Sequence, residues 1–249
     1  MNDKEIELNR YDQRAEEFLK QENNYLNKIP LLVNEPYEHY FKIFEKFKNK
    51  KKLLEIGAGM GENTLRLVQM NFNVCSTDLS PNSVEVMKRR FRKFKNFSSK
   101  KADIENLPFD DCSFDLVCGA GSLSYGNNIL VMEEIFRVLK PGGVVILIDS
   151  LNENLIYKLN RYFHYLRKKR SKSTLINMPD INLIEKYINK FGYGDVRFFG
   201  SLTWIYPLLR IFLPEKYISK FSNWFDIKIN VKKSAFKFIL ILKKNFNDK

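Results

Sequence analysis

The sequence predicts an α/β protein in which a doubly wound, mostly parallel sheet of seven strands carries helices on both faces. Two observations lead to this fold class. The apolar run at residues 53–56 is typical of a buried parallel strand, and it ends in a glycine-rich turn, residues 57–61, which a helical pattern follows. Further apolar runs then alternate with helical patterns as far as residue 150. Chains built from repeated βα units fold into parallel sheets.

The elements of the first part of the chain follow from this periodicity. Apolar residues recur at helical spacing in residues 3–28 and 35–48, and these two helices should lie over the opening of the ligand site as a cap. Ser80 and Pro81 are a typical N-cap and first residue of a helix. The predicted core is strand 52–57, helix 61–71, strand 73–77, helix 81–91, strand 97–101, strand 114–119, helix 128–139 and strand 144–149.

After residue 150 the pattern is less regular. It predicts helices at 157–170 and 181–191 and two final strands at 196–199 and 235–242. Between these strands, residues 202–213 form an aromatic, apolar insert that Pro207 interrupts. The insert is too short to span a membrane, so it either closes a ligand pocket or touches a membrane surface.

The glycine-rich turn is suited to a nucleotide-like ligand. Glycine lets the backbone pass close to a ligand, and the start of the next helix offers free N–H groups. The spacing differs from the dinucleotide fingerprint G-x-G-x-x-G, because Gly61 follows Gly59 by two residues rather than three. The pattern is Glu-x-Gly-x-Gly-x-Gly, starting at Glu55. An ordinary strand-to-helix turn is the alternative for this motif alone.

Residues 55–61, Glu-Ile-Gly-Ala-Gly-Met-Gly, resemble the first motif of the class I S-adenosylmethionine-dependent methyltransferases. The resemblance implies a Rossmann-like methyltransferase fold whose loop wraps the methionine part of the cofactor. It extends over about residues 50–150, because further motifs follow in the family's order. They are Asp78, Asp103-Ile104, the Phe-Asp-x-Val sequence of residues 114–117, and residues 133–143.

The resemblance also implies which residues bind the cofactor. An acid at Asp78 can accept hydrogen bonds from both ribose hydroxyls. In the family, the acid at Asp103 accepts from the adenine amino group while Ile104 packs on the ring. Tyr11 lies in a segment similar to Tyr-Asp-x-x-Ala, whose tyrosine often contacts the methionine end; a core aromatic is the alternative. The predicted cofactor is S-adenosyl-L-methionine, with S-adenosyl-L-homocysteine as product, and the predicted binding residues are Tyr11, Glu55, Gly57, Ala58, Gly59, Gly61, Asp78, Leu79, Asp103, Ile104, Gly119 and Ala120.

Catalytic and acceptor-binding candidates come from outside this core. An alcohol acceptor usually needs a base near its hydroxyl, and the chain has only two histidines, His39 and His164. Both are predicted as catalytic, with a packing or surface histidine as the alternative. Residues 149–170 loosely resemble a subgroup of methyltransferases from bacterial polysaccharide and natural-product clusters. Arginines of this segment suit a phosphate or carboxylate. The predicted substrate-binding residues are Asn154, Arg161 and Arg170.

These motifs predict one methyltransferase domain over residues 1–249. It divides into a helical cap at 1–48, a cofactor-binding core at 49–150 and acceptor-side helices, insert and last strands at 151–249. The predicted reaction is O-methylation of a sugar or sugar phosphate of a bacterial surface polysaccharide, such as capsule or O-antigen. The alternatives are a lipid- or quinone-like acceptor at the membrane surface and a non-catalytic cofactor-binding subunit. Nucleic acid is not expected as acceptor, because no Asn/Asp-Pro-Pro-Tyr motif follows the fourth strand.

Composition sets the remaining bounds. The chain has 249 residues, 44% of them apolar and 29% charged, which is ordinary for a soluble protein. The net charge of +13 fits a basic surface, although lysine-rich composition also follows from an AT-rich genome. The three widely spaced cysteines are read as buried hydrophobic residues rather than disulfides, and no metal site is expected. The sequence therefore predicts a cytoplasmic enzyme without an obligate protein partner, with peripheral contact to the inner membrane as a further possibility.

Overall fold

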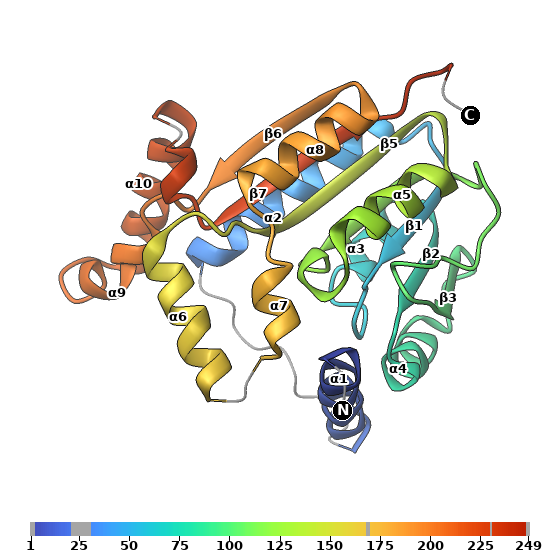
Figure 1. The fold of residues 1–249 in the computed structure, drawn as a ribbon, viewed down its shortest axis with the longest axis horizontal. Helices are drawn as coiled ribbons and strands as arrows, with labels where there is room; N and C mark the ends of the chain where they lie inside the picture. Colours follow the sequence, from blue (N-terminus) through green and yellow to red (C-terminus); the bar gives the residue numbers. More distant parts are fainter. Residues whose placement is uncertain (1–2, 21–30, 168–169, 230, 248–249) are drawn as a thin grey trace.

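The structure is a computed structural model that describes residues 3–20, 31–167, 170–229 and 231–247. Seven strands form one sheet in the order β3-β2-β1-β4-β5-β7-β6, with helices on both faces (Figure 1). β7 runs antiparallel to its neighbours β5 and β6, and the other pairs are parallel. The strands are β1 (Lys52–Ile56), β2 (Asn73–Asp78), β3 (Phe97–Lys101), β4 (Phe114–Ala120), β5 (Leu139–Ser150), β6 (Gly194–Phe199) and β7 (Lys237–Lys243).

The predicted fold class is confirmed: the sheet is doubly wound, seven-stranded and mostly parallel. β5 begins five residues earlier than the prediction of 144–149, because Leu139 already pairs with Phe114 of β4. The last strand in the sequence lies between β5 and β6 rather than at the edge. Its register with β5 runs from Lys243, opposite Val144, to Lys237, opposite Ser150.

The helices agree with the sequence in the core and differ outside it. The helices predicted at 3–28 and 157–170 end at Lys20 and Leu166 within the described residues, and residues 21–28 and 168–169 lie outside them. Two helices, α7 and α10, were not predicted. The α-helices are α1 (Asp3–Lys20), α2 (Leu31–Phe44), α3 (Thr64–Gln69), α4 (Pro81–Phe91), α5 (Asn128–Val138), α6 (Leu155–Leu166), α7 (Lys172–Ile176), α8 (Ile181–Phe191), α9 (Tyr206–Leu209) and α10 (Glu215–Lys228), and the 3₁₀ turns are η1 (Glu45–Phe47), η2 (Leu123–Tyr125), η3 (Thr203–Ile205) and η4 (Lys232–Ser234).

The core lies on both faces of the sheet, because successive strand residues point to opposite sides. In β1, Leu54 and Ile56 join the cluster that α5 and α8 cover, whereas Leu53 joins the cluster that α2 and α3 cover. These residues are fully buried. A strand that is buried on both faces is apolar along most of its length, and within residues 53–56 Glu55 is the exception.

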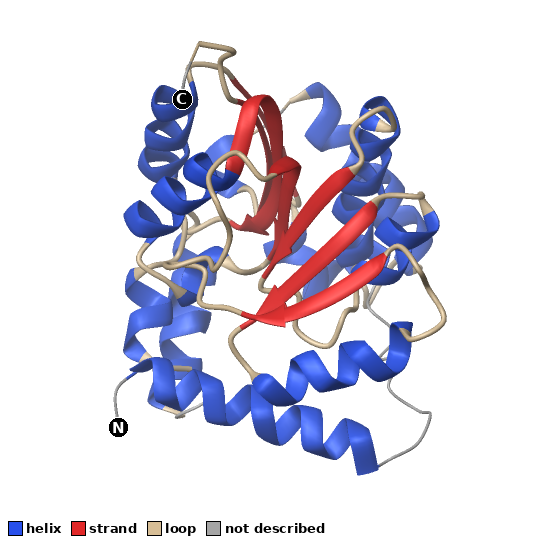
Figure 2. Cartoon of the chain, turned by 90° about the vertical axis from the view of Figure 1, so that its right-hand side faces the viewer, coloured by secondary structure: helices blue, strands red, loops and turns tan. Residues whose placement is uncertain are grey.

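The two N-terminal helices do not form a joint cap. Tyr40, Phe41 and Phe44 give α2 a wide apolar stripe, which is buried against the sheet together with Leu53. The expectation that α2 covers the site is therefore wrong. α1 alone reaches the site: it begins beside the N-terminus and runs along α4 beneath the sheet (Figure 2).

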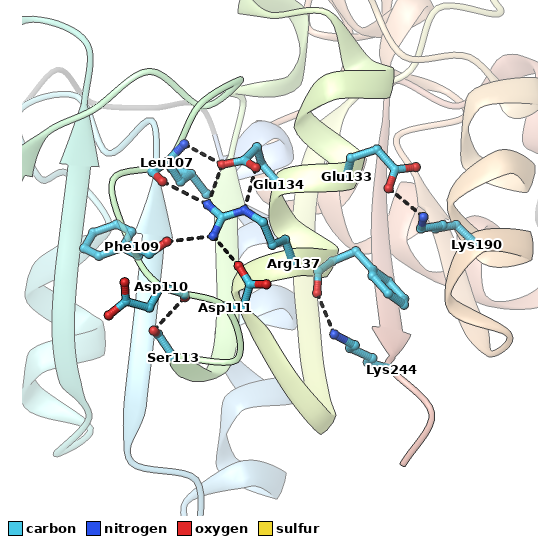
Figure 3. A network of polar contacts seen from close by, with 11 residues as sticks. Leu107, Phe109, Asp110, Asp111, Ser113, Glu133, Glu134, Arg137, Lys190 and Lys244 are labelled. Carbon is cyan, nitrogen blue, oxygen red and sulfur yellow. Dashed lines mark hydrogen bonds and ion pairs between the residues drawn. The ribbon is translucent and has the colours of Figure 1, made fainter. Parts of the chain in front are cut away.

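A network around Arg137 of α5 fixes the loop between β3 and β4 (Figure 3). The guanidinium donates to the backbone carbonyls of Phe109 at 2.7 Å and Leu107 at 3.0 Å. It also forms a bidentate ion pair with Glu134 and donates to the Asp111 carboxylate at 2.8 Å. The Glu134 carboxylate in turn accepts from the Leu107 N–H at 2.6 Å. The loop that follows Asp103 is therefore held to α5 by one side chain.

Replacing this side chain should cost stability. Arg137→Lys keeps the charge but cannot reach two carbonyls and two carboxylates at once, so we expect the free energy of unfolding to fall by about 1–2 kcal/mol. Urea unfolding measures the change. Lys190→Met is the matched control, because Lys190 bonds the neighbouring Glu133 at 2.6 Å but the pair is exposed, and its loss should cost less than about 0.5 kcal/mol. Equal losses in the two variants would contradict the proposed importance of the network.

Candidate active site

A pocket opens at the carboxyl ends of β1, β2 and β4, where the strand order reverses between β1 and β4. It encloses about 220 Å³ and is lined by residues of α1, β1, β2 and β4 and of the loops that follow these strands. The pocket gathers most of the predicted cofactor residues. Those that line it are Tyr11, Glu55, Gly57, Ala58, Gly59, Asp78, Leu79, Asp103, Ile104 and Ala120.

The glycine turn forms the floor of the pocket. Gly57 and Gly59 have φ angles of +59° and +58°, which favour glycine. A Cβ on Gly57 would also lie 2.6 Å from the Ser122 Cβ. The Gly59 N–H donates to the Asp78 carboxylate at 2.8 Å, and the Ala58 N–H donates to the Thr77 carbonyl at 2.9 Å. The turn is therefore tied to the end of β2.

Glu55 lies beneath the turn and is buried. One of its carboxylate oxygens accepts hydrogen bonds from the Thr64 and Ser76 hydroxyls, each at 2.6 Å. Burial raises the pKa of the Glu55 carboxyl to about 7, against the opposing effect of the two hydroxyls. The buried acid of the motif thus changes its charge close to neutral pH.

Two further acids line the pocket at the ends of β2 and β3. Asp78 is held by the N–H groups of Gly59 and Ser80, at 2.8 and 2.9 Å, and burial raises the pKa of its carboxyl. Asp103 accepts from the Glu105 N–H at 3.0 Å and forms an ion pair with Lys4 at 2.7 Å. Lys4 also pairs with Glu105 at 2.7 Å, so α1 is fastened to the end of β3.

A pair of tyrosines forms the wall between α1 and η2. The Tyr11 hydroxyl donates to the Tyr125 hydroxyl at 2.9 Å, and the rings meet edge to face with centroids 5.6 Å apart. Arg10 also donates to the Tyr125 hydroxyl, at 3.3 Å. Because this oxygen accepts two hydrogen bonds, the proton of Tyr125 is left to donate to a ligand. Burial raises the pKa of Tyr11, so Tyr11 remains a neutral donor.

The remaining predicted residues lie elsewhere. Gly61 and Gly119 do not line the pocket, and a Cβ on either would meet packed neighbours at 2.4 Å and 2.8 Å. His39 stacks near Phe199, with ring centroids 5.1 Å apart, and lines a separate pocket formed by residues of α2, α3 and α10. His164, on α6, is not among the residues that line the active-site pocket.

The predicted substrate-binding residues also lie outside this pocket. Asn154 is the N-cap of α6 and accepts from the Ile156 N–H at 2.8 Å. Arg161 is buried and donates to the Leu151 carbonyl at 3.1 Å and the Asn152 side chain at 3.0 Å. Burial lowers the pKa of Arg161 to about 10. Both residues therefore serve the segment that follows β5, and Arg170 does not line the pocket either.

Sequence reasoning missed several pocket residues: Lys4, Leu8, Ser122 and Tyr125. Ser122 and Tyr125 directly follow β4, and the position at the switch point of the sheet was a signal for both. The buried Ser122 hydroxyl has no hydrogen-bond partner among the described residues. An unpartnered hydroxyl beside the glycine turn, with the free lone pairs of Asp78, fits a ligand that carries amino and hydroxyl groups.

Comparisons with known proteins agree with this site. Residues 54–147 match a family model described as a methyltransferase domain. The demethylmenaquinone methyltransferase of Staphylococcus haemolyticus is 32% identical over 168 residues, which span 59% of this chain and 70% of that protein. The sterol 4-C-methyltransferase strm-1 of Caenorhabditis elegans is 34% identical over 116 residues, 45% of this chain and 34% of that protein.

A solved structure shares the fold over most of its length. It is a putative sarcosine dimethylglycine methyltransferase from Galdieria sulphuraria, with a TM-score of 0.60, 14% identity and coverage of 95% of this chain and 98% of that one. The strand order and the glycine turn with its acids define the class I S-adenosylmethionine-dependent methyltransferases. The chain belongs to this family. It is therefore an enzyme that uses S-adenosylmethionine, as predicted, and the alternative of a non-catalytic subunit is not supported.

The charge of Glu55 predicts how stability depends on pH. An unfolded glutamate has a pKa near 4.3, so between about pH 4.5 and 7 the folded protein holds one proton more than the unfolded chain. The free energy of unfolding should therefore fall as the pH rises through this window. Glu55→Gln removes the effect, and the stability difference, wild type minus variant, should fall by roughly 3 kcal/mol from pH 4.5 to 7.5.

Denaturant unfolding of the cofactor-free protein at several pH values measures this difference. Glu45→Gln, at an exposed position, controls for the loss of a carboxylate. A difference between wild type and Glu55→Gln that stays constant with pH would show that folding does not raise the pKa of Glu55.

Proposed function

We propose that this methyltransferase transfers its methyl group to a lipid- or quinone-like acceptor. The cofactor supplies a methyl group on a sulfonium, which is already a good leaving group, so the protein mainly positions the reactants. The observation that carries the proposal is the Tyr11–Tyr125 pair, which offers aromatic surface and one hydroxyl proton to an acceptor. A planar ring that carries an oxygen matches both features.

The cofactor assignment within the proposal follows the acids of the pocket. Asp78 would accept from the ribose hydroxyls, because the N–H groups of Gly59 and Ser80 engage only part of its four lone-pair sites. Asp103 and Ile104 would hold the adenine, and the turn at residues 57–61 would follow the methionine part. Glu55 and Ser122, which line the pocket, would offer partners to the charged and polar groups of that part.

The charges of the pocket argue against a phosphorylated acceptor. Lys4 is paired with Asp103 and Glu105, and Arg14 lies 3.9 Å from Glu62. These cations are already neutralised by neighbouring carboxylates. Arg161, on which the expectation of a sugar phosphate rested, is bonded to the backbone beyond β5. The relatives that act on a quinone or a sterol, as their names state, support the apolar alternative.

Asp78 tests the cofactor part of the proposal. Asp78→Asn keeps the shape of the side chain but removes a charged acceptor, so affinity for S-adenosyl-L-homocysteine should fall about tenfold or more. Isothermal titration calorimetry measures the affinity. Asp110→Asn, in the exposed loop before β4, is the control and should bind like wild type. Unchanged affinity in Asp78→Asn would refute the ribose assignment.

Tyr125 tests the acceptor part. We expect methyl transfer from labelled cofactor to a short-chain naphthoquinol that lacks the ring methyl, and none to a hexose phosphate. Tyr125→Phe removes the donor to the acceptor oxygen and should lower kcat about 10–100-fold without changing cofactor affinity. Tyr193→Phe, an exposed position at the start of β6, should leave kcat unchanged. Transfer to the hexose phosphate alone would restore the sugar prediction.

A further inference from the structure

Helix α6 directs its apolar face to solvent and its polar face toward the protein. Leu155, Leu159, Phe163 and Leu166 recur at helical spacing on one face, yet this face is exposed, with 57% of Phe163 accessible. Tyr157 and Arg161, on the opposite face, are buried. Arg161 donates to the Leu151 carbonyl and the Asn152 side chain, which fixes the polar side inward. The apolar stripe of α6 is therefore directed away from the protein.

Helix α10 shows the same inversion. Tyr217, Phe221 and Trp224 are exposed, whereas the buried face carries one apolar residue, Ile218, beside the polar Ser219, Ser222 and Asp226. The Asp226 carboxylate accepts from the N–H groups of Gly200 and Ser201, at 2.6 and 3.0 Å, and Ser219 donates to Glu35 at 2.8 Å. These bonds prevent α10 from rolling its aromatic side into the core. The polar contacts of its buried face therefore fix α10 with its aromatic side chains toward solvent.

The segment between them extends the same surface. Leu208, Ile211, Phe212 and Leu213 are all exposed, Phe212 by 76%. α6, α9 and α10 lie at one end of the molecule, opposite α4 and β3 (Figure 1). Tyr157 of α6 packs on Phe236, with ring centroids 5.0 Å apart, and the Phe236 N–H bonds the Phe199 carbonyl, next to the residues that Asp226 holds. Both helices are thus anchored to the same strand ends.

The charges around this surface are mostly positive. Residues 203–234 contain six basic residues and two acidic ones, and one of the acids, Asp226, is buried. Lys216, Lys220 and Lys228 are exposed among the aromatics of α10, and Lys158 and Arg167 flank the stripe of α6. A second copy of the chain would bring like charges together across a symmetric interface. Anionic lipid complements both the charge and the apolar stripe.

We infer that the outward faces of α6 and α10, with residues 208–213 between them, dock on an anionic lipid bilayer. Leucines and aromatics on one face with lysine and arginine at its borders are what a helix lying in a membrane interface requires. Within the ranges that the structure describes, no helix is long and apolar enough to cross a bilayer. The inference goes beyond the proposed acceptor, since membrane binding is measurable without any methyl transfer.

Vesicle co-sedimentation of the purified full chain tests the inference. We expect binding to vesicles that contain phosphatidylglycerol, weaker binding at high salt, and little binding to phosphatidylcholine alone. Phe212→Ser with Trp224→Ser should weaken binding about tenfold or more. Lys216→Glu with Lys220→Glu should weaken it by reversing the charge at the rim. These residues are exposed, so circular dichroism should show an unchanged fold.

Phe246→Ser is the matched control, because Phe246 is 74% exposed but follows β7 at the other end of the sheet. It should bind vesicles like wild type. Binding that is absent, or that survives the Phe212→Ser, Trp224→Ser change, would overturn the inference. A dimer in solution that this double change dissociates, with no vesicle binding by the wild type, would assign the surface to a second copy instead. Because no acceptor is present in the assay, its failure would leave the proposed methyl transfer untouched.

Discussion

The hydrogen bond between the Gly59 N–H and the Asp78 carboxylate is the constraint on which the site depends. It holds the glycine turn against the end of β2. It also satisfies one oxygen of a carboxylate that is mostly buried. Burial raises the pKa of Asp78, so the folded protein keeps an acid where its charge is costly. Glu55, beneath the turn, is a second such acid. Groups held at a cost to stability are expected at ligand sites rather than in a core built for packing.

Helix α1 is held in place by contacts with the strand ends around this site. It is fastened across the pocket by Lys4 to Asp103, by Tyr11 to Tyr125, and by Asp12, which accepts from the Ser80 hydroxyl. These three contacts reach the ends of β3, β4 and β2. One helix therefore touches the walls of both the cofactor region and the proposed acceptor region, and any movement of α1 would change both together.

The cofactor side of the site could be predicted because its chemistry is local. Glycines with positive φ and acids at strand ends recur at spacings that the sequence displays, so Gly57, Asp78 and Asp103 were found without the fold. The acceptor side depends on which face of each helix packs against the rest of the protein. Arg161 is on the buried face of α6 and His39 packs on Phe199, and no periodicity in the sequence tells which face of a helix the protein covers. The inversion of α10 rests on Asp226 meeting the backbone of residues 200–201, a contact between distant parts of the sequence.

The same inner contacts connect the exposed apolar surface to the tyrosine wall. Arg161 holds the backbone of Leu151, two residues beyond Asp149, and the buried Asp149 carboxylate accepts from the Leu123 N–H at 2.9 Å. Leu123 begins η2, which ends at Tyr125. The polar face of α6 is thus packed against the segment that positions the proposed acceptor donor, while its apolar face is directed outward. The hydrogen bonds that turn the apolar face of α6 outward are therefore linked, through Asp149 and Leu123, to the segment that carries Tyr125.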